Sequence, residues 1–67
     1  GAPDLVVFID DSPNNLESVR ANVPSARLIH FVAHDALRPL VRDVAGVRLK
    51  TGDWLAVEHV VDGFVQG

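Results

Sequence analysis

The sequence predicts an α/β fold built on a small parallel sheet, and two features indicate it. Residues 5–9, "LVVFI", form a continuous apolar and largely β-branched run, which is typical of a strand covered on both faces. A helix signal follows at once, and a second apolar run at residues 28–32 follows that helix. Strands that are joined through helices pair in parallel. With 67 residues and 48% hydrophobic content, the chain has a core for one small domain.

The first helix is predicted directly after the first strand. Ser12 is a natural N-cap, and Pro13 suits the first helical position, where its missing N–H costs nothing. Apolar residues then recur at helical spacing, at Leu16, Val19 and Val23. Pro24 ends this helix, so the strand, turn and helix are predicted together.

A second helix is predicted after the second strand. His34 or Asp35 can cap it, and Gly46 stops it at its C-terminal end. Pro39 falls near the first turn, where a proline is tolerated. The apolar stripe of this helix comprises Leu37, Leu40, Val41 and Val44.

The last third of the sequence leaves two interpretations open. Residues 47–50 alternate like a short strand, and residues 51–53 would suit a hairpin loop. A final helix over about residues 54–64, capped by Thr51 or Asp53, is the favoured interpretation, with Trp54 as its anchor on the core. The apolar residues that support this helix are Val57, Val60, Val61 and Phe64.

The predicted order is β-α-β-α, a short extended piece and a C-terminal helix. This order describes a partial Rossmann-like parallel sheet, a fragment of a doubly wound domain, in which residues 1–67 form a single partial domain. One helix cannot cover both faces of the first strand. We therefore expect either a missing N-terminal part of the domain or a homodimer to complete the sheet.

Composition excludes several classes of protein. The net charge of −3 gives no reason to expect nucleic acid or an anionic membrane as a partner. The sequence has no cysteine, which excludes disulfides, zinc–thiolate sites and a thiol nucleophile. Its apolar runs are too short for a transmembrane helix or a signal peptide, so a cytoplasmic location is expected.

Asp10 and Asp11 end the first predicted strand, at the edge of the sheet where α/β proteins bind ligands. Their side chains point to opposite sides of the strand, so one can face the crevice while the other caps a turn or holds a metal-bound water. Neighbouring carboxylates oppose each other's ionisation unless a cation stabilises them, and Mg²⁺ suits such a pair. The alternative is structural: Asp11 belongs to an Asx turn or helix cap, and Asp10 is solvated.

"VVFIDDSPNNLESVR", followed by "ARLIHFV" and "LRPLV", resembles the C-terminal part of the haloacid dehalogenase-like (HAD) hydrolases. The resemblance covers about residues 4–45 and centres on the acidic fourth motif of that family. It implies a Mg²⁺-dependent phosphate-ester hydrolase in which Asp10 and Asp11 bind the metal, supported by Ser12 and Asn15. Asn15 falls where many members carry a further Asp, which reduces its expected role to hydrogen bonding or water positioning.

The same resemblance shows what the chain lacks. Members attack a phosphorylated small molecule with an aspartate from an Asp-x-Asp motif, and this sequence contains no Asp-x-Asp. Lys50, the only lysine, follows the acidic motif, whereas the lysine of the family precedes it. We therefore expect no catalytic residue in this chain and no phosphatase activity when it is alone.

Two alternatives belong to other classes. A receiver domain of a phosphorelay also places an acidic pair after its first strand, and Asp53 would then be the phosphate acceptor. A non-catalytic, dimerising structural module is the other alternative. The histidines His30, His34 and His59 are expected to be structural or surface residues. The basic residues Arg38, Arg42, Arg48 and Lys50 are expected to form a solvated face, with phosphate binding as the minor alternative.

Overall fold

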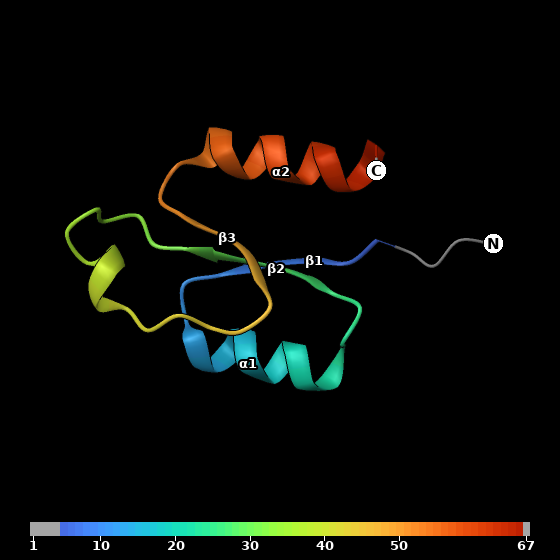
Figure 1. Cartoon of the computed structure of the whole chain (residues 1–67), viewed down its shortest axis with the longest axis horizontal. Coiled ribbons are helices and arrows are strands. Elements are labelled where there is room, and N and C mark those ends of the chain that lie inside the picture. The colour runs from blue at the N-terminus through green and yellow to red at the C-terminus, as the bar shows by residue number, and fades with distance from the viewer. Residues whose placement is uncertain (1–4, 67) are drawn as a thin grey trace.

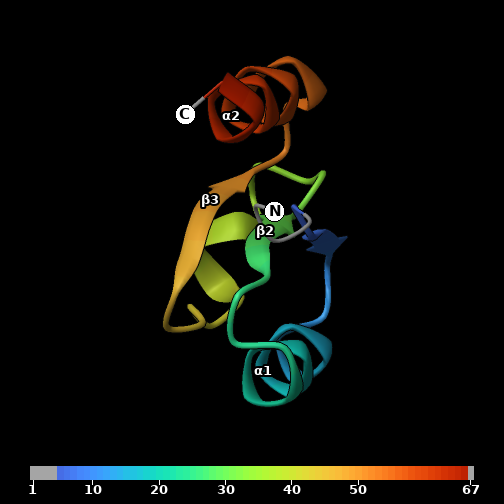
Figure 2. The same ribbon diagram turned by 90° about the vertical axis from the view of Figure 1, so that its right-hand side faces the viewer.

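The computed structural model describes residues 5–66, which fold into a parallel sheet with one helix on each face (Figure 1). The elements follow the order β1 (Val7–Asp10), α1 (Pro13–Asn22), β2 (Arg27–Phe31), β3 (Val47–Thr51) and α2 (Trp54–Gln66). The sheet has three strands in the order β1-β2-β3, so β2 is central and both outer strands have a free edge. Viewed along the sheet, α1 and α2 lie on opposite sides of it (Figure 2). The predicted α/β class is confirmed.

Both strand pairs are parallel, which brings the three carboxyl ends to one edge of the sheet. In the first pair, Val7 lies opposite Arg27 and Asp10 lies opposite His30. The second pair contains an irregularity between Leu28 and Ile29. The acidic end of β1 therefore lies beside the end of β2.

The two faces of the sheet are packed differently. On the α1 side, Leu16, Leu28 and Val44 form the buried cluster against which Phe8 packs. Since side chains alternate along a strand, Val7, Ile9 and Ile29 belong to the opposite face, on the side of α2. The residues that pack on the α1 cluster while remaining partly exposed are Phe8, Val19, Ala26 and Val47.

Helix α2 is joined to the sheet by an aromatic contact. The rings of Phe31 and Trp54 are stacked, with their centroids 4.1 Å apart and an interplanar angle of 24°. Trp54 therefore makes the predicted contact between the last helix and the sheet, although 61% of it remains exposed. Val57, one turn further along, is buried.

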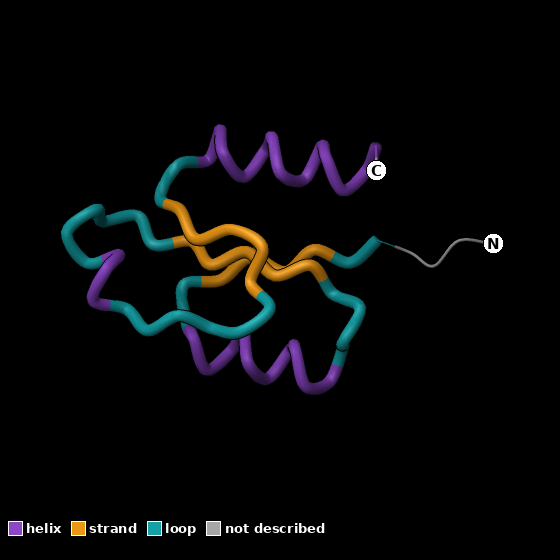
Figure 3. The backbone as a smooth tube through the Cα atoms, in the orientation of Figure 1, coloured by secondary structure: helices purple, strands orange, loops and turns teal. Residues whose placement is uncertain are grey.

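The prediction of a helix between His34 or Asp35 and Gly46 was wrong. This segment is mostly loop, with a single 3₁₀ turn at Arg38–Leu40 (Figure 3). Pro39 has no N–H to donate to the carbonyl four residues earlier, and it disfavours helical backbone at the residue before it. Of the expected apolar stripe, Val44 is buried, but Leu40 is 78% exposed.

Gly46 does adopt the left-handed conformation expected of it, with a φ of +84°. It does so in a turn before β3, where the N–H of Val47 donates to the carbonyl of Val44 at 3.4 Å, and not at a helix end. The turn feeds the chain into β3, and this role replaces the predicted helix cap.

The final helix is confirmed, and residues 47–50 do form a strand, as their alternation predicts. The hairpin loop at residues 51–53 was wrong, because this strand leads into α2 and pairs in parallel with β2. Asp53 provides the cap: its carboxylate accepts the N–H of Leu55 at 2.9 Å. Thr51 supports this turn by accepting the N–H of Asp53 at 3.1 Å. Within residues 5–66, neither helix has the length and apolar character needed to cross a bilayer.

Candidate functional site

The Asp10 carboxylate organises the turn between β1 and α1. Its Oδ1 accepts the N–H groups of Asp11 at 2.7 Å and Ser12 at 3.1 Å, and its Oδ2 accepts the side-chain amide of Asn15 at 3.0 Å. The N–H of Ser12 is the largest cause that lowers the pKa of Asp10, followed by the amide of Asn15. Hydrogen bonds to the ionised form thus keep this carboxylate negative at neutral pH.

This geometry reverses the roles in the structural alternative. Asp10, and not Asp11, makes the Asx-type turn, while Asp11 is exposed. Ser12 caps α1 as predicted, with its hydroxyl accepting the N–H of Asn15 at 3.4 Å. The expected hydrogen-bonding role of Asn15 is fulfilled by its contact with Asp10.

His30 fixes the loop that carries Asp11. It is fully buried at the end of β2, and its Nε2 lies 3.2 Å from the backbone carbonyl oxygen of Asp11. Because a carbonyl only accepts, Nε2 is the donor in this hydrogen bond. Nδ1 is buried without a hydrogen-bond partner among the described residues. The expected structural role of His30 therefore includes holding the acidic turn against β2.

No direct signal in the sequence predicts this contact. A histidine within an apolar strand indicates burial but does not reveal its partner. The pairing of Asp10 with His30 across β1 and β2 supplies that information, and it requires the register of the sheet. By contrast, His59 is exposed, as expected, and His34, expected as a core or strand-end residue, is exposed just beyond the end of β2.

The donor set at this turn fits a hydrated magnesium ion. Mg²⁺ binds through one or two carboxylates and retains several waters, so it does not require a cage of protein ligands. Asp10 is ionised and Asp11 is exposed to solvent. Across residues 5–66 no group of three or more His, Cys, Asp or Glu side chains is gathered for a metal. Asp10 and Asp11 are the residues of this turn that would hold such an ion.

Asp53 does not join the acidic pair. It follows β3, and β2 lies between β3 and β1, which separates the two strand ends by about 10 Å at the usual strand spacing. Its carboxylate also caps α2. This arrangement argues against a receiver-type site, in which the acceptor aspartate must lie beside the acidic pair.

The basic residues of the 38–50 segment are mostly paired at the surface. Arg38 pairs with Asp35, and Arg42 pairs with Glu17. The Lys50 ammonium lies 2.8 Å from the Asp43 carboxylate and 2.5 Å from the carbonyl of Val41. The Arg42–Glu17 pair joins the loop between β2 and β3 to α1, and the contacts of Lys50 join the same loop to β3. Arg42 and Arg48 are exposed, as expected of a solvated face, whereas the side chains of Arg38 and Lys50 are only 24% and 20% exposed.

Comparisons of this chain with protein-family models, with curated proteins and with solved structures found no match.

Proposed function

We propose that the acidic end of β1 is the magnesium-binding part of a HAD-like phosphate-ester hydrolase. Asp10 and Asp11 are the metal ligands, and Ser12 and Asn15 hold the turn in place. The observation that carries this proposal is the position of the pair: an ionised Asp10 and an exposed Asp11 at the carboxyl end of a strand in a parallel sheet.

The bound ion would neutralise charge on a phosphoryl group during transfer. This chain supplies no Asp-x-Asp nucleophile, so the nucleophile belongs to another segment. A parallel strand added at the free edge of β1 would end beside Asp10 and Asp11, where such a nucleophile is needed. In this proposal the observed sheet is part of a larger, doubly wound, Rossmann-like sheet.

Magnesium titration followed by amide NMR tests the metal site. We expect saturable shifts confined to the turn at residues 10–15, and we expect Asp11→Asn to weaken them strongly because it removes the exposed carboxylate. Asp62→Asn is the matched control, since Asp62 is exposed on α2, away from the turn. Shifts that are absent, or that are equally weakened by the control, would refute the metal site.

The free edge of β1 also supports a second candidate function, that of a dimerising module. Leu5, Val6 and Ile9 are 43%, 42% and 37% exposed, and the run they belong to contains no charge or proline. The other edge differs: β3 carries Arg48 and Lys50, and its pairing is irregular. Charges and irregular pairing protect an edge strand from a second chain. Strand β1 pairs regularly with β2, and its one charged residue, Asp10, is at its last position.

The backbone of β1 suits pairing with a second copy. The N–H of Arg27 donates to the carbonyl of Val6 at 2.8 Å, so Val6 faces β2 and the polar groups of Val7 and Ile9 face the free edge. An antiparallel two-fold pairing through Val7 would join two sheets into one, with both α1 helices on the same face.

Light scattering during size exclusion tests this pairing. We expect a dimer, and we expect Ile9→Lys to shift it to a monomer because a charge is placed on the edge. Leu55→Lys, at another exposed apolar residue, is the control and leaves the dimer intact. A monomeric wild-type chain would refute the dimer without affecting the metal proposal.

A further inference from the structure

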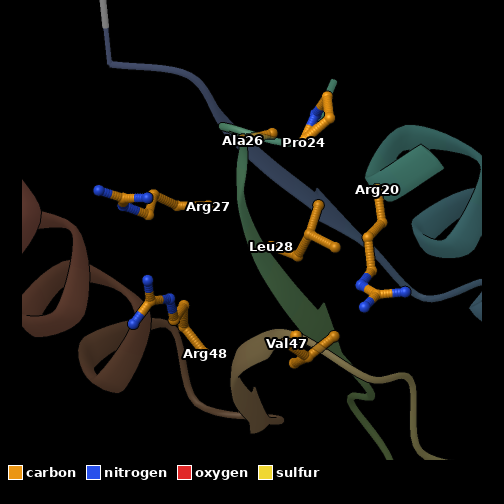
Figure 4. A pocket seen from close by; sticks show the side chains of 8 residues that line it. Arg20, Pro24, Ala26, Arg27, Leu28, Val47 and Arg48 are labelled. Carbon is orange, nitrogen blue, oxygen red and sulfur yellow. The ribbon is translucent and has the colours of Figure 1, made fainter. Parts of the chain in front are cut away.

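A cavity of about 400 Å³ opens at the amino ends of β2 and β3, the end of the sheet opposite the acidic turn. Three of the five arginines in the sequence line it: Arg20, Arg27 and Arg48 (Figure 4). Its remaining wall is small and apolar, formed by Pro24, Ala26, Leu28, Gly46 and Val47. The volume falls in the range of small-molecule sites.

These arginines come from three different elements. Arg20 lies in the last turn of α1, Arg27 begins β2, and Arg48 lies in β3. Figure 4 shows Arg27 and Arg48 extending from their strands toward α2, while Arg20 approaches from α1. Arg27 and Arg48 therefore bring their positive charges to the α2 side of the sheet, whereas Arg20 lies on the α1 side, with Leu28 between it and them. No local motif predicts this arrangement.

Arg27 and Arg20 each lie close to another part of the chain. The Arg27 guanidinium lies 5.9 Å from the ring centre of Phe64, within the range of a cation–π contact. Arg20 crosses the backbone of Gly46, where an added Cβ would lie 3.0 Å from its Nε. A glycine at that position therefore lets Arg20 lie close to the chain.

The charge pairing divides the basic residues of the chain into two sets. Arg38, Arg42 and Lys50 each pair with a carboxylate. Within residues 5–66, Arg20, Arg27 and Arg48 form no such ion pair. Arg20 does act on a carboxylate at longer range, because its charge helps to lower the pKa of Glu17.

We propose that this cavity binds a small phosphate-bearing molecule with two or more negative charges. Guanidinium groups bind phosphate oxygens through paired, charge-assisted hydrogen bonds. Such an anion would also relieve the mutual repulsion of Arg27 and Arg48. This site is distinct from the acidic turn and does not depend on the proposed magnesium site.

Titration calorimetry with inorganic pyrophosphate, in buffer containing EDTA, tests the proposal. EDTA removes divalent cations, so binding through Asp10 and Asp11 cannot contribute. We expect saturable binding, weakened about tenfold or more by Arg27→Gln and by Arg48→Gln, because each removes a charge-assisted contact. Arg42→Gln is the control: it changes the net charge equally at a paired arginine outside the cavity, and it leaves the affinity within about twofold.

Amide NMR of the same samples locates the site and confirms that each variant is folded. Shifts at residues 20–28 and 46–48 support the cavity. The proposal is overturned if pyrophosphate does not bind, if Arg42→Gln weakens binding as much as the cavity variants, or if citrate binds more tightly than pyrophosphate. The last outcome would assign the cavity to carboxylates.

Discussion

Gly52 is the residue at which the backbone is most tightly constrained. A Cβ there would lie 2.5 Å from the carbonyl oxygen of Val32, which is backbone and cannot move aside. We predict that Gly52→Ala destabilises the chain by about 1–3 kcal/mol, the usual range for overpacking. Thermal or urea unfolding measures this loss.

The control for this substitution lies in the same chain. Gly63 lies within α2, and a Cβ added there would meet nothing within 4 Å. Gly63→Ala should therefore stabilise the helix by about 0.5–1 kcal/mol, because alanine loses less conformational entropy. Equal effects of the two substitutions would contradict the close approach at Gly52.

Gly46 is constrained by its conformation more than by its neighbours. Its φ of +84° lies in the left-handed region, which costs an ordinary L-residue about 1–2 kcal/mol. We predict that Gly46→Ala destabilises the fold by about this amount and displaces Arg20, whose Nε would lie 3.0 Å from the new Cβ. Denaturant unfolding checks the first effect. Unchanged Arg20 Nε–H resonances would contradict the second.

At the scale of elements, the sequence predicted the features that depend on residues close together in the chain, above all the starts of the two helices. Ser12 with Pro13 begins α1, and Asp53 caps α2, because a capping side chain binds backbone only a few residues away. The loop after β2 was mispredicted because its apolar spacing satisfies a helix while Pro39 prevents one. A helix here would lose a backbone hydrogen bond at Pro39, and its apolar spacing does not compensate for that loss.

The candidate sites show the same division. Asp10 and Asp11 are neighbours in the sequence, so their position at a strand end was predictable. The contact of Asp11 with His30, and the position of Arg27 and Arg48 on one side of the sheet, depend on strand order and register. No local pattern contains that information.

Two surface ion pairs connect the loop between β2 and β3 to its neighbours: Arg42 pairs with Glu17 of α1, and Asp43 pairs with Lys50 of β3. The pKa shifts of the two carboxyl groups predict an effect of pH. The hydrogen bond from Arg42 lowers the pKa of Glu17, and that from Lys50 lowers the pKa of Asp43. The ordinary pKa values are 4.5 for Glu17 and 3.8 for Asp43, and both are lowered in the folded state. Each ion pair therefore stabilises the fold at pH values above the ordinary pKa. This stabilisation is lost as the pH falls through the lower, folded-state pKa.

We therefore predict that the loop loosens below about pH 4, seen as faster amide exchange at residues 41–45. Asp43→Asn removes one of these pairs and should show part of this loosening already at pH 7. Added salt should mimic the effect, because both pairs are exposed and screened. If the protection of these amides relative to an unfolded peptide stays the same as the pH falls, the prediction is contradicted.

At the scale of the whole molecule, the two proposed sites lie at opposite ends of one small sheet. The acidic turn is at the carboxyl end, and the arginine-lined cavity is at the amino end. Strands of four or five residues separate them by roughly 15 Å at the usual rise per residue. A phosphate group in the cavity therefore cannot contact a magnesium ion at Asp11, so neither site completes the other.

We predict that the isolated chain does not hydrolyse phosphate esters, because neither site completes the other and the acidic turn has no nucleophile. A metal held by Asp10 and Asp11 would stabilise transferred charge, but the chain offers no Asp-x-Asp nucleophile beside it. Assay of the pure chain with p-nitrophenyl phosphate and Mg²⁺ should give the buffer rate. Turnover that requires Mg²⁺, persists through purification and disappears in Asp11→Asn would contradict the prediction and place a nucleophile within these 67 residues. Turnover unchanged in Asp11→Asn would instead reveal a contaminating phosphatase.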